Sequence, residues 1–104
     1  MRPINRQATL KSPAICGGVA LHSGEYVKLA LKPAPTGTGI VFIRTDVTDR
    51  DNRVPARPDA VCDVRNCTKI KNAAGVMVGT IEHLMAALAA SGIDNLYIEL
   101  DGPE

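Results

Sequence analysis

The sequence is poor in aromatic residues and has no excess of either charge. Among its 104 residues, the aromatic ones are Tyr26, Phe42 and Tyr97, and tryptophan is absent. The core must therefore be aliphatic, and few rings are available on which exposed bases could stack. Twelve lysine and arginine residues against 11 aspartate and glutamate residues leave a formal net charge of +1. We therefore expect no nucleic-acid partner, since that requires a broad basic field.

Long apolar runs are absent as well. The longest uninterrupted one covers residues 84–90, whereas a membrane-spanning helix needs about 18 apolar residues. Residues 1–10 include Arg2 and Arg6, but no apolar segment follows that would complete a secretory signal. The sequence thus predicts no transmembrane segment and a cytoplasmic location.

Cysteine is scarce and unpaired. Cys16, Cys62 and Cys67 form an odd set without a Cys-x-x-Cys pair, so we expect neither a disulfide framework nor a zinc knuckle. Cys62 and Cys67 could share a metal ion. We favour the alternative of reduced thiols that pack as small hydrophobic side chains, which suits a cytoplasmic protein.

The composition and length are those of one globular domain, with 45% hydrophobic and 22% charged residues. Residues 26–32 alternate apolar and polar side chains with the period of a half-buried strand. Pro33 and Pro35 end this strand, because proline cannot donate to a ladder. The glycine-containing turn 36–39 then predicts a hairpin with a returning strand at 40–45.

Further strands are expected on both sides of that hairpin. An earlier strand is predicted within 7–15, with a bend or bulge at Gly17 and Gly18. The charged segment 46–58 is typical of an exposed loop. The remaining predicted strands are short and cover residues 60–64, 67–71, 76–78 and 96–100.

One helix is predicted from residue 80 to residue 91. Thr80 suits the N-cap, and Gly92 suits the left-handed position that closes a helix. Its apolar positions have the spacing of one helical face and are Ile81, Leu84, Met85 and Leu88. The fold class is therefore α+β, a small and mostly antiparallel sheet layered with one main helix.

Glu82 and His83 are the candidate functional residues, in the first turn of this helix. The helix N-terminus carries partial positive charge, which stabilises the Glu82 carboxylate and favours a neutral His83. A neutral imidazole is the form that binds a metal. A purely structural helix start explains both residues equally well. His22, the other histidine, is expected to support a turn.

Several segments together resemble one family. They are GVALHSG at 18–24, KPAP at 32–35, RTD at 44–46, TIEHLMAAL at 80–88 and GIDN at 92–95. Their order and spacing are similar to those of the UDP-3-O-acyl-N-acetylglucosamine deacetylases, zinc hydrolases of lipid A biosynthesis in Gram-negative bacteria. The segments cover nearly the whole chain.

The resemblance implies roles for four residues. The position of Glu82 is that of the family's general base, and the position of His83 is that of a zinc ligand. Leu21 and Cys67 match positions near the groove for the substrate, a UDP-linked acylated amino sugar. The family fold is a two-domain α/β sandwich with the active site between its domains.

The sequence also departs from the family pattern. The other zinc ligands come from a His-x-x-x-Asp segment, but Tyr26 follows His22 and Ala87 follows His83 at that spacing. The later proton-donating histidine has no counterpart either. We therefore expect residues 1–104 to be an incomplete first domain, inactive alone, whose missing remainder supplies the other ligands. A non-catalytic binding module or remnant of the family, and a purely structural α+β module, are the alternatives.

Overall fold

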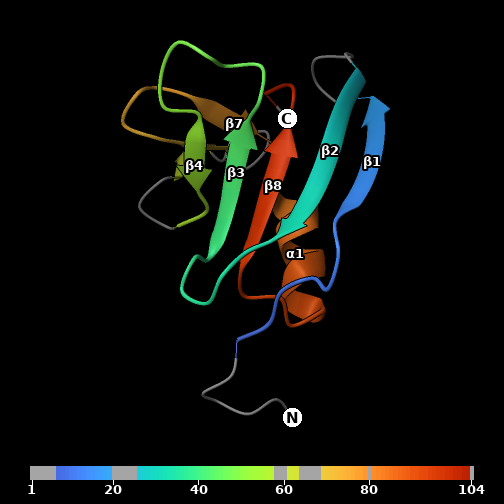
Figure 1. The fold of residues 1–104 in the computed structure, drawn as a ribbon. Helices are drawn as coiled ribbons and strands as arrows, with labels where there is room; N and C mark the ends of the chain where they lie inside the picture. The colour runs from blue at the N-terminus through green and yellow to red at the C-terminus, as the bar shows by residue number, and fades with distance from the viewer. Residues whose placement is uncertain (1–6, 20–25, 58–60, 64–68, 80, 104) are drawn as a thin grey trace.

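A computed structural model of the protein describes residues 7–19, 26–57, 61–63, 69–79 and 81–103 (Figure 1). Within these ranges the elements are β1 (Ala14–Val19), β2 (Tyr26–Pro33), β3 (Ile40–Arg44), β4 (Arg53–Pro55), β5 (Val61–Asp63), β6 (Lys69–Lys71), β7 (Met77–Gly79), α1 (Glu82–Ala90) and β8 (Leu96–Leu100).

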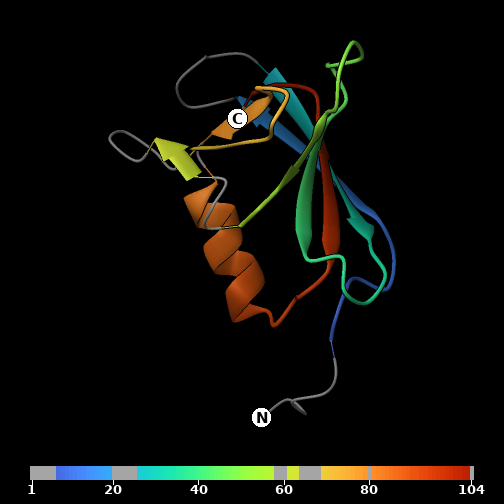
Figure 2. The same cartoon turned by 90° about the vertical axis from the view of Figure 1, so that its left-hand side faces the viewer.

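The described strands form two sheets. The mixed sheet has five strands in the order β1-β2-β8-β3-β4, in which only the β3–β8 pair is parallel. The small sheet is antiparallel and has the order β5-β6-β7. Helix α1 lies against one face of the mixed sheet, here called the inner face, and its N-terminal end is beside the small sheet (Figure 2). The predicted α+β class is confirmed.

The predicted hairpin between the strands at 26–32 and 40–45 is wrong. Both strands exist, but β8 lies between them, antiparallel to β2 and parallel to β3. The turn does occur, with positive φ at Gly37 and Gly39. Alternating polarity determines which face of a strand is buried, but it does not specify the neighbouring strand. The pattern therefore could not show that β8, distant in the sequence, lies between β2 and β3.

Two further expectations about strands are corrected. The first strand is β1 and begins after Pro13, and Gly17 and Gly18 pair in regular register with Lys28 and Val27 instead of forming a bulge. The charged segment 46–58 contains β4, whose Val54 is fully buried. A three-residue strand with one inward side chain is too short to show a period in the sequence.

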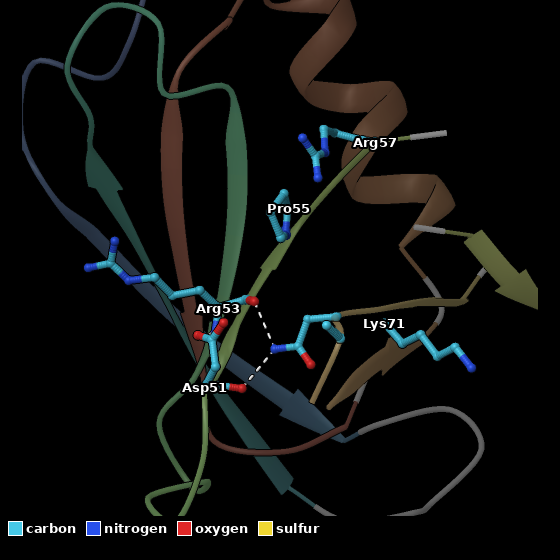
Figure 3. A pocket seen from close by; sticks show the side chains of 7 residues that line it. Asp51, Arg53, Pro55, Arg57 and Lys71 are labelled. Atoms are coloured by element: carbon cyan, nitrogen blue, oxygen red, sulfur yellow. Dashed lines mark hydrogen bonds between the residues drawn. The ribbon is translucent and has the colours of Figure 1, made fainter. Parts of the chain in front are cut away.

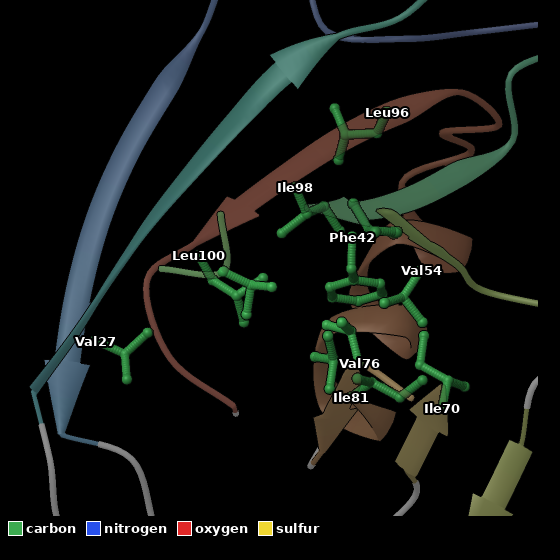
Figure 4. Packing of buried hydrophobic residues seen from close by; sticks show 12 residues of the cluster. Val27, Phe42, Val54, Ile70, Val76, Ile81, Leu96, Ile98 and Leu100 are labelled. Atoms are coloured by element: carbon green, nitrogen blue, oxygen red, sulfur yellow. The ribbon is translucent and has the colours of Figure 1, made fainter. Parts of the chain in front are cut away.

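The core lies between the inner face of the mixed sheet, α1 and the small sheet (Figure 4). Its most deeply buried large side chains are those of Phe42, Val54, Ile70, Val76, Val78, Leu96, Ile98 and Leu100. Three of them belong to β8, in the middle of the mixed sheet. As expected from the sequence, this core is aliphatic apart from Phe42.

Helix α1 presents its predicted apolar face to this core. Ile81 and Leu88 are buried, and Leu84 and Met85 pack partly buried against the cluster. The helix ends as predicted: Gly92 has φ 73°, and the Ile93 N–H donates to the Leu88 carbonyl, a Schellman-type closure. At its other end, α1 begins at Glu82 and its N-cap is Ile81, which makes no side-chain cap hydrogen bond. The predicted start and N-cap at Thr80 are therefore wrong by one residue; Thr80 itself lies outside the described residues.

Asn95 joins three segments at the end of the mixed sheet. Its side chain is 3% exposed, accepts from the Gly39 N–H at 2.8 Å and donates to Gln7 Oε1 at 2.8 Å. The same Gln7 oxygen accepts from the Gly37 N–H. Residues 7–9, predicted as strand, instead form an arm bonded to this turn and to Asp94, whose carboxylate accepts from the Ala8 N–H.

Replacing Asn95 with alanine should therefore destabilise the chain. The substitution leaves the Gly39 N–H without its acceptor in a part-buried place, and the loss of an acceptor from a buried donor typically costs about 1–3 kcal/mol. Urea unfolding of the wild-type and Asn95→Ala chains measures the difference. Thr48→Ala, at an exposed position, is the control and should change the free energy of unfolding by less than about 0.5 kcal/mol. An equal, small effect of both substitutions would contradict the assigned role of Asn95.

Candidate functional site

The candidate site is the N-terminal turn of α1. Glu82 is the first residue of the helix and is half-buried. Ile81, immediately before it, is 7% exposed and anchors this end of the helix in the core. The backbone of His83 is the second helical position, about 100° further round the helix axis than Glu82. The two residues thus occupy adjacent directions on one helical turn.

Strand β7 leads directly into this turn and is held to the mixed-sheet part of the molecule at both of its ends. The Gly79 N–H donates to the Pro103 carbonyl at 2.7 Å. At the other end, Arg44 Nη1 donates to the Met77 carbonyl at 3.1 Å. The position of the α1 N-terminus is therefore coupled to β3 and to the segment after β8.

The described residues do not form a metal centre by themselves. Among them, no group of three or more His, Cys, Asp or Glu side chains is close enough to hold a metal ion. Leu21, His22 and Cys67 lie outside the described residues, so the roles predicted for them stay predictions. Of His83 only the backbone is described, and catalytic zinc takes about three protein ligands.

A pocket of about 400 Å³ opens between β4 and the turn after β6 (Figure 3). It is lined by Asp51, Arg53, Pro55, Arg57, Lys71, Asn72 and Ala73. The side chains of Arg53 and Lys71 extend in opposite directions (Figure 3). The Arg53 guanidinium lies 5.7 Å from the centre of the Tyr97 ring, on the outer face of the mixed sheet. The positive charges of these two residues do not converge on one ligand.

Asn72 supports the wall of this pocket. Its Nδ2 donates to the Asp51 and Arg53 carbonyls at 2.7 and 2.9 Å, and its Oδ1 accepts from the N–H groups of Ala74 and Val76. One side chain thus orders the β6–β7 turn and fastens it to β4. Asn72 and Gly75 are residue types typical of a turn, but nothing in the sequence indicates the bonds to β4.

Comparison with known proteins identifies the class. The family model for UDP-3-O-acyl N-acetylglycosamine deacetylase matches residues 7–104. The chain belongs to this family, as the segments at 18–24 and 80–88 had predicted.

Individual relatives agree with the family match. A protein named UDP-3-O-acyl-N-acetylglucosamine deacetylase from Phenylobacterium zucineum is 54% identical over 98 residues, which cover 94% of this chain and 33% of that protein. The protein of the same name from Myxococcus xanthus is 54% identical over 105 residues, covering 100% of this chain and 33% of its own length. A third, from Tolumonas auensis, is 52% identical over 101 residues.

The chain therefore spans about a third of the length of the curated relatives that it matches. In the part of the chain that the structure describes, no helix is long and apolar enough to cross a membrane.

Proposed function

We propose that residues 1–104 are the N-terminal part of a zinc-dependent hydrolase that removes the acetyl group from UDP-3-O-acyl-N-acetylglucosamine in lipid A biosynthesis. The observation that carries the proposal is the family match, which runs through 7–104 and includes Glu82 and His83. The three relatives bear the name of this activity. In this proposal the chain is the first domain of a longer cytoplasmic enzyme, and three cysteines without a Cys-x-x-Cys pair suit that compartment.

Glu82 is the proposed general base, which accepts a proton from the water that attacks the acetamide carbonyl. Its place in the first turn of α1 supports this role in two ways. The partial positive charge of the helix end stabilises the carboxylate, and the buried Ile81 beside it fixes the turn. Leu21 and Cys67 are proposed to line the substrate groove, on the strength of the family resemblance.

His83 is the proposed zinc ligand of this segment. The described residues contain no cluster of three or more donors, and in this proposal the segment supplies one ligand of the zinc site. In this proposal the other ligands come from the two thirds of the relatives' length that the chain does not cover. Zinc, when bound, would supply a Lewis acid that polarises the acetamide carbonyl.

A chimera tests the proposal directly. The matched residues of the Myxococcus xanthus relative are replaced by this chain, and the purified protein is assayed for release of acetate from UDP-3-O-acyl-N-acetylglucosamine. We expect turnover with one zinc per chain. Glu82→Gln should keep the zinc and lower kcat by about 10²–10⁴-fold, because a general base contributes that much. His83→Ala should lose zinc.

The control for Glu82→Gln is Glu99→Gln, which removes a carboxylate from the outer face of the mixed sheet and should leave kcat unchanged. Normal turnover of the Glu82→Gln chimera would rule out the assigned base. An inert chimera, made from an active parent and correctly folded, would favour the alternative of a non-catalytic family remnant.

The 104-residue chain by itself should bind zinc weakly and release no acetate. A single imidazole provides one coordination bond, and catalytic zinc needs about three protein ligands. Metal content after gel filtration and an acetate assay at high protein concentration measure both properties. Tight, stoichiometric zinc together with deacetylation by the short chain would show that the ligand set is complete within these residues.

A further inference from the structure

Arg44 is a charged side chain on the inner face of the mixed sheet. It is the last residue of β3 and pairs in register with Leu100, on the same face as the buried Phe42. Its side chain is only 15% exposed. Asp46 neutralises it with two parallel bonds, Nε to Oδ1 at 3.1 Å and Nη2 to Oδ2 at 2.5 Å. The guanidinium is thus held in one orientation.

The third guanidinium nitrogen, Nη1, is directed toward the small sheet. Arg44 Nη1 donates to the carbonyl oxygen of Met77, the first residue of β7, at 3.1 Å. Strands β3 and β7 belong to different sheets, so this side chain makes a polar link between them. Glu82 follows Met77 by five positions in the chain, and Gly79, at the end of β7, is held by Pro103.

Stability alone is a poor explanation for this pair. The Asp46 side chain is 34% exposed, and an ion pair that solvent reaches typically adds little to the free energy of unfolding, so apolar residues in its place would cost little stability. Apolar residues could not donate to the Met77 carbonyl, however. A lysine could not bond to both carboxylate oxygens and also donate to the Met77 carbonyl, because it lacks the planar fork of arginine.

We propose that Arg44, oriented by Asp46, is a positioning residue that fixes the start of β7 at Met77 and, through this strand, the location of Glu82 and of the His83 backbone. This inference rests on the proposed function and extends it to residues outside the first turn of α1. The apolar face of α1 sets the rotation and depth of the helix through Ile81 and Leu88. The Arg44 bond holds the start of the strand that leads to that helix, and the Gly79–Pro103 bond holds the end of the strand.

A link that fixes the position of Glu82 matters because catalysis is sensitive to small displacements of the reacting groups. A displacement of a reacting group by about 1 Å can lower the rate about 10²-fold even when its cause is remote from the chemistry. The loss of the bond to Met77 should therefore reduce kcat more than it raises KM, because substrate contacts elsewhere are unaffected.

The test uses the Myxococcus xanthus chimera defined above with the double substitution Arg44→Met and Asp46→Leu, which removes both charges together. We expect a folded protein whose kcat is lowered about 10²-fold, with KM changed much less. Amide hydrogen exchange should be at least about tenfold faster at β7 and at residues 81–85, and unchanged in β2 and β8. Arg44→Lys should keep the fold and show the same pattern in weaker form.

The matched control is Lys32→Met with Glu99→Leu. This removes an ion pair of 3.0 Å from the outer face of the same sheet, and it should alter neither kcat nor exchange in α1. If the Arg44–Asp46 double variant keeps wild-type kcat and exchange at 81–85, the proposal is wrong. If that variant does not fold, Arg44→Lys decides by the same two measurements. A wild-type chimera without deacetylase activity would refute the proposed function, whereas the exchange data would still decide the role of Arg44.

Discussion

The fold depends on the burial of β8 in the middle of the mixed sheet. Leu96, Ile98 and Leu100 are 0%, 0% and 2% exposed, and they form the surface on which α1 and the small sheet pack. The same strand bonds to β2 on one side and to β3 on the other. Since these two strands do not touch each other, the sheet is continuous only because β8 joins them.

The elements that the sequence predicts well are those with a local period. The bounds of β8 were predicted correctly and the apolar face of α1 was identified, because alternation and helical spacing depend on neighbouring residues. Strand pairing was predicted incorrectly, since period 2 carries no information about which strand is adjacent. Strand β4 was missed because Val54 is its one inward side chain, surrounded by charged residues that are typical of a loop.

The sequence likewise identifies some residues of the candidate site and misses others. Glu82 and His83 were recognised because they belong to a segment that resembles a known family. Arg44 and Asn72 were not assigned a role, although both hold the approach to α1. The contacts that fasten them to other strands are made to the backbone carbonyls of Met77, Asp51 and Arg53, and a carbonyl oxygen is the same in every residue. No residue type in the sequence marks such a contact.

The insertion of β8 between β2 and β3 has a consequence for the nascent chain. Translation proceeds at about 5–20 residues per second. After β2 is synthesised, its edge opposite β1 therefore stays unpaired for on the order of several seconds, until β8 is made. An unpaired strand edge is a template for association with other chains. Lys28 and Lys32 are exposed on β2, and lysine on an open edge opposes such association. Charges that contribute little to the finished sheet can thus protect its precursor on the ribosome.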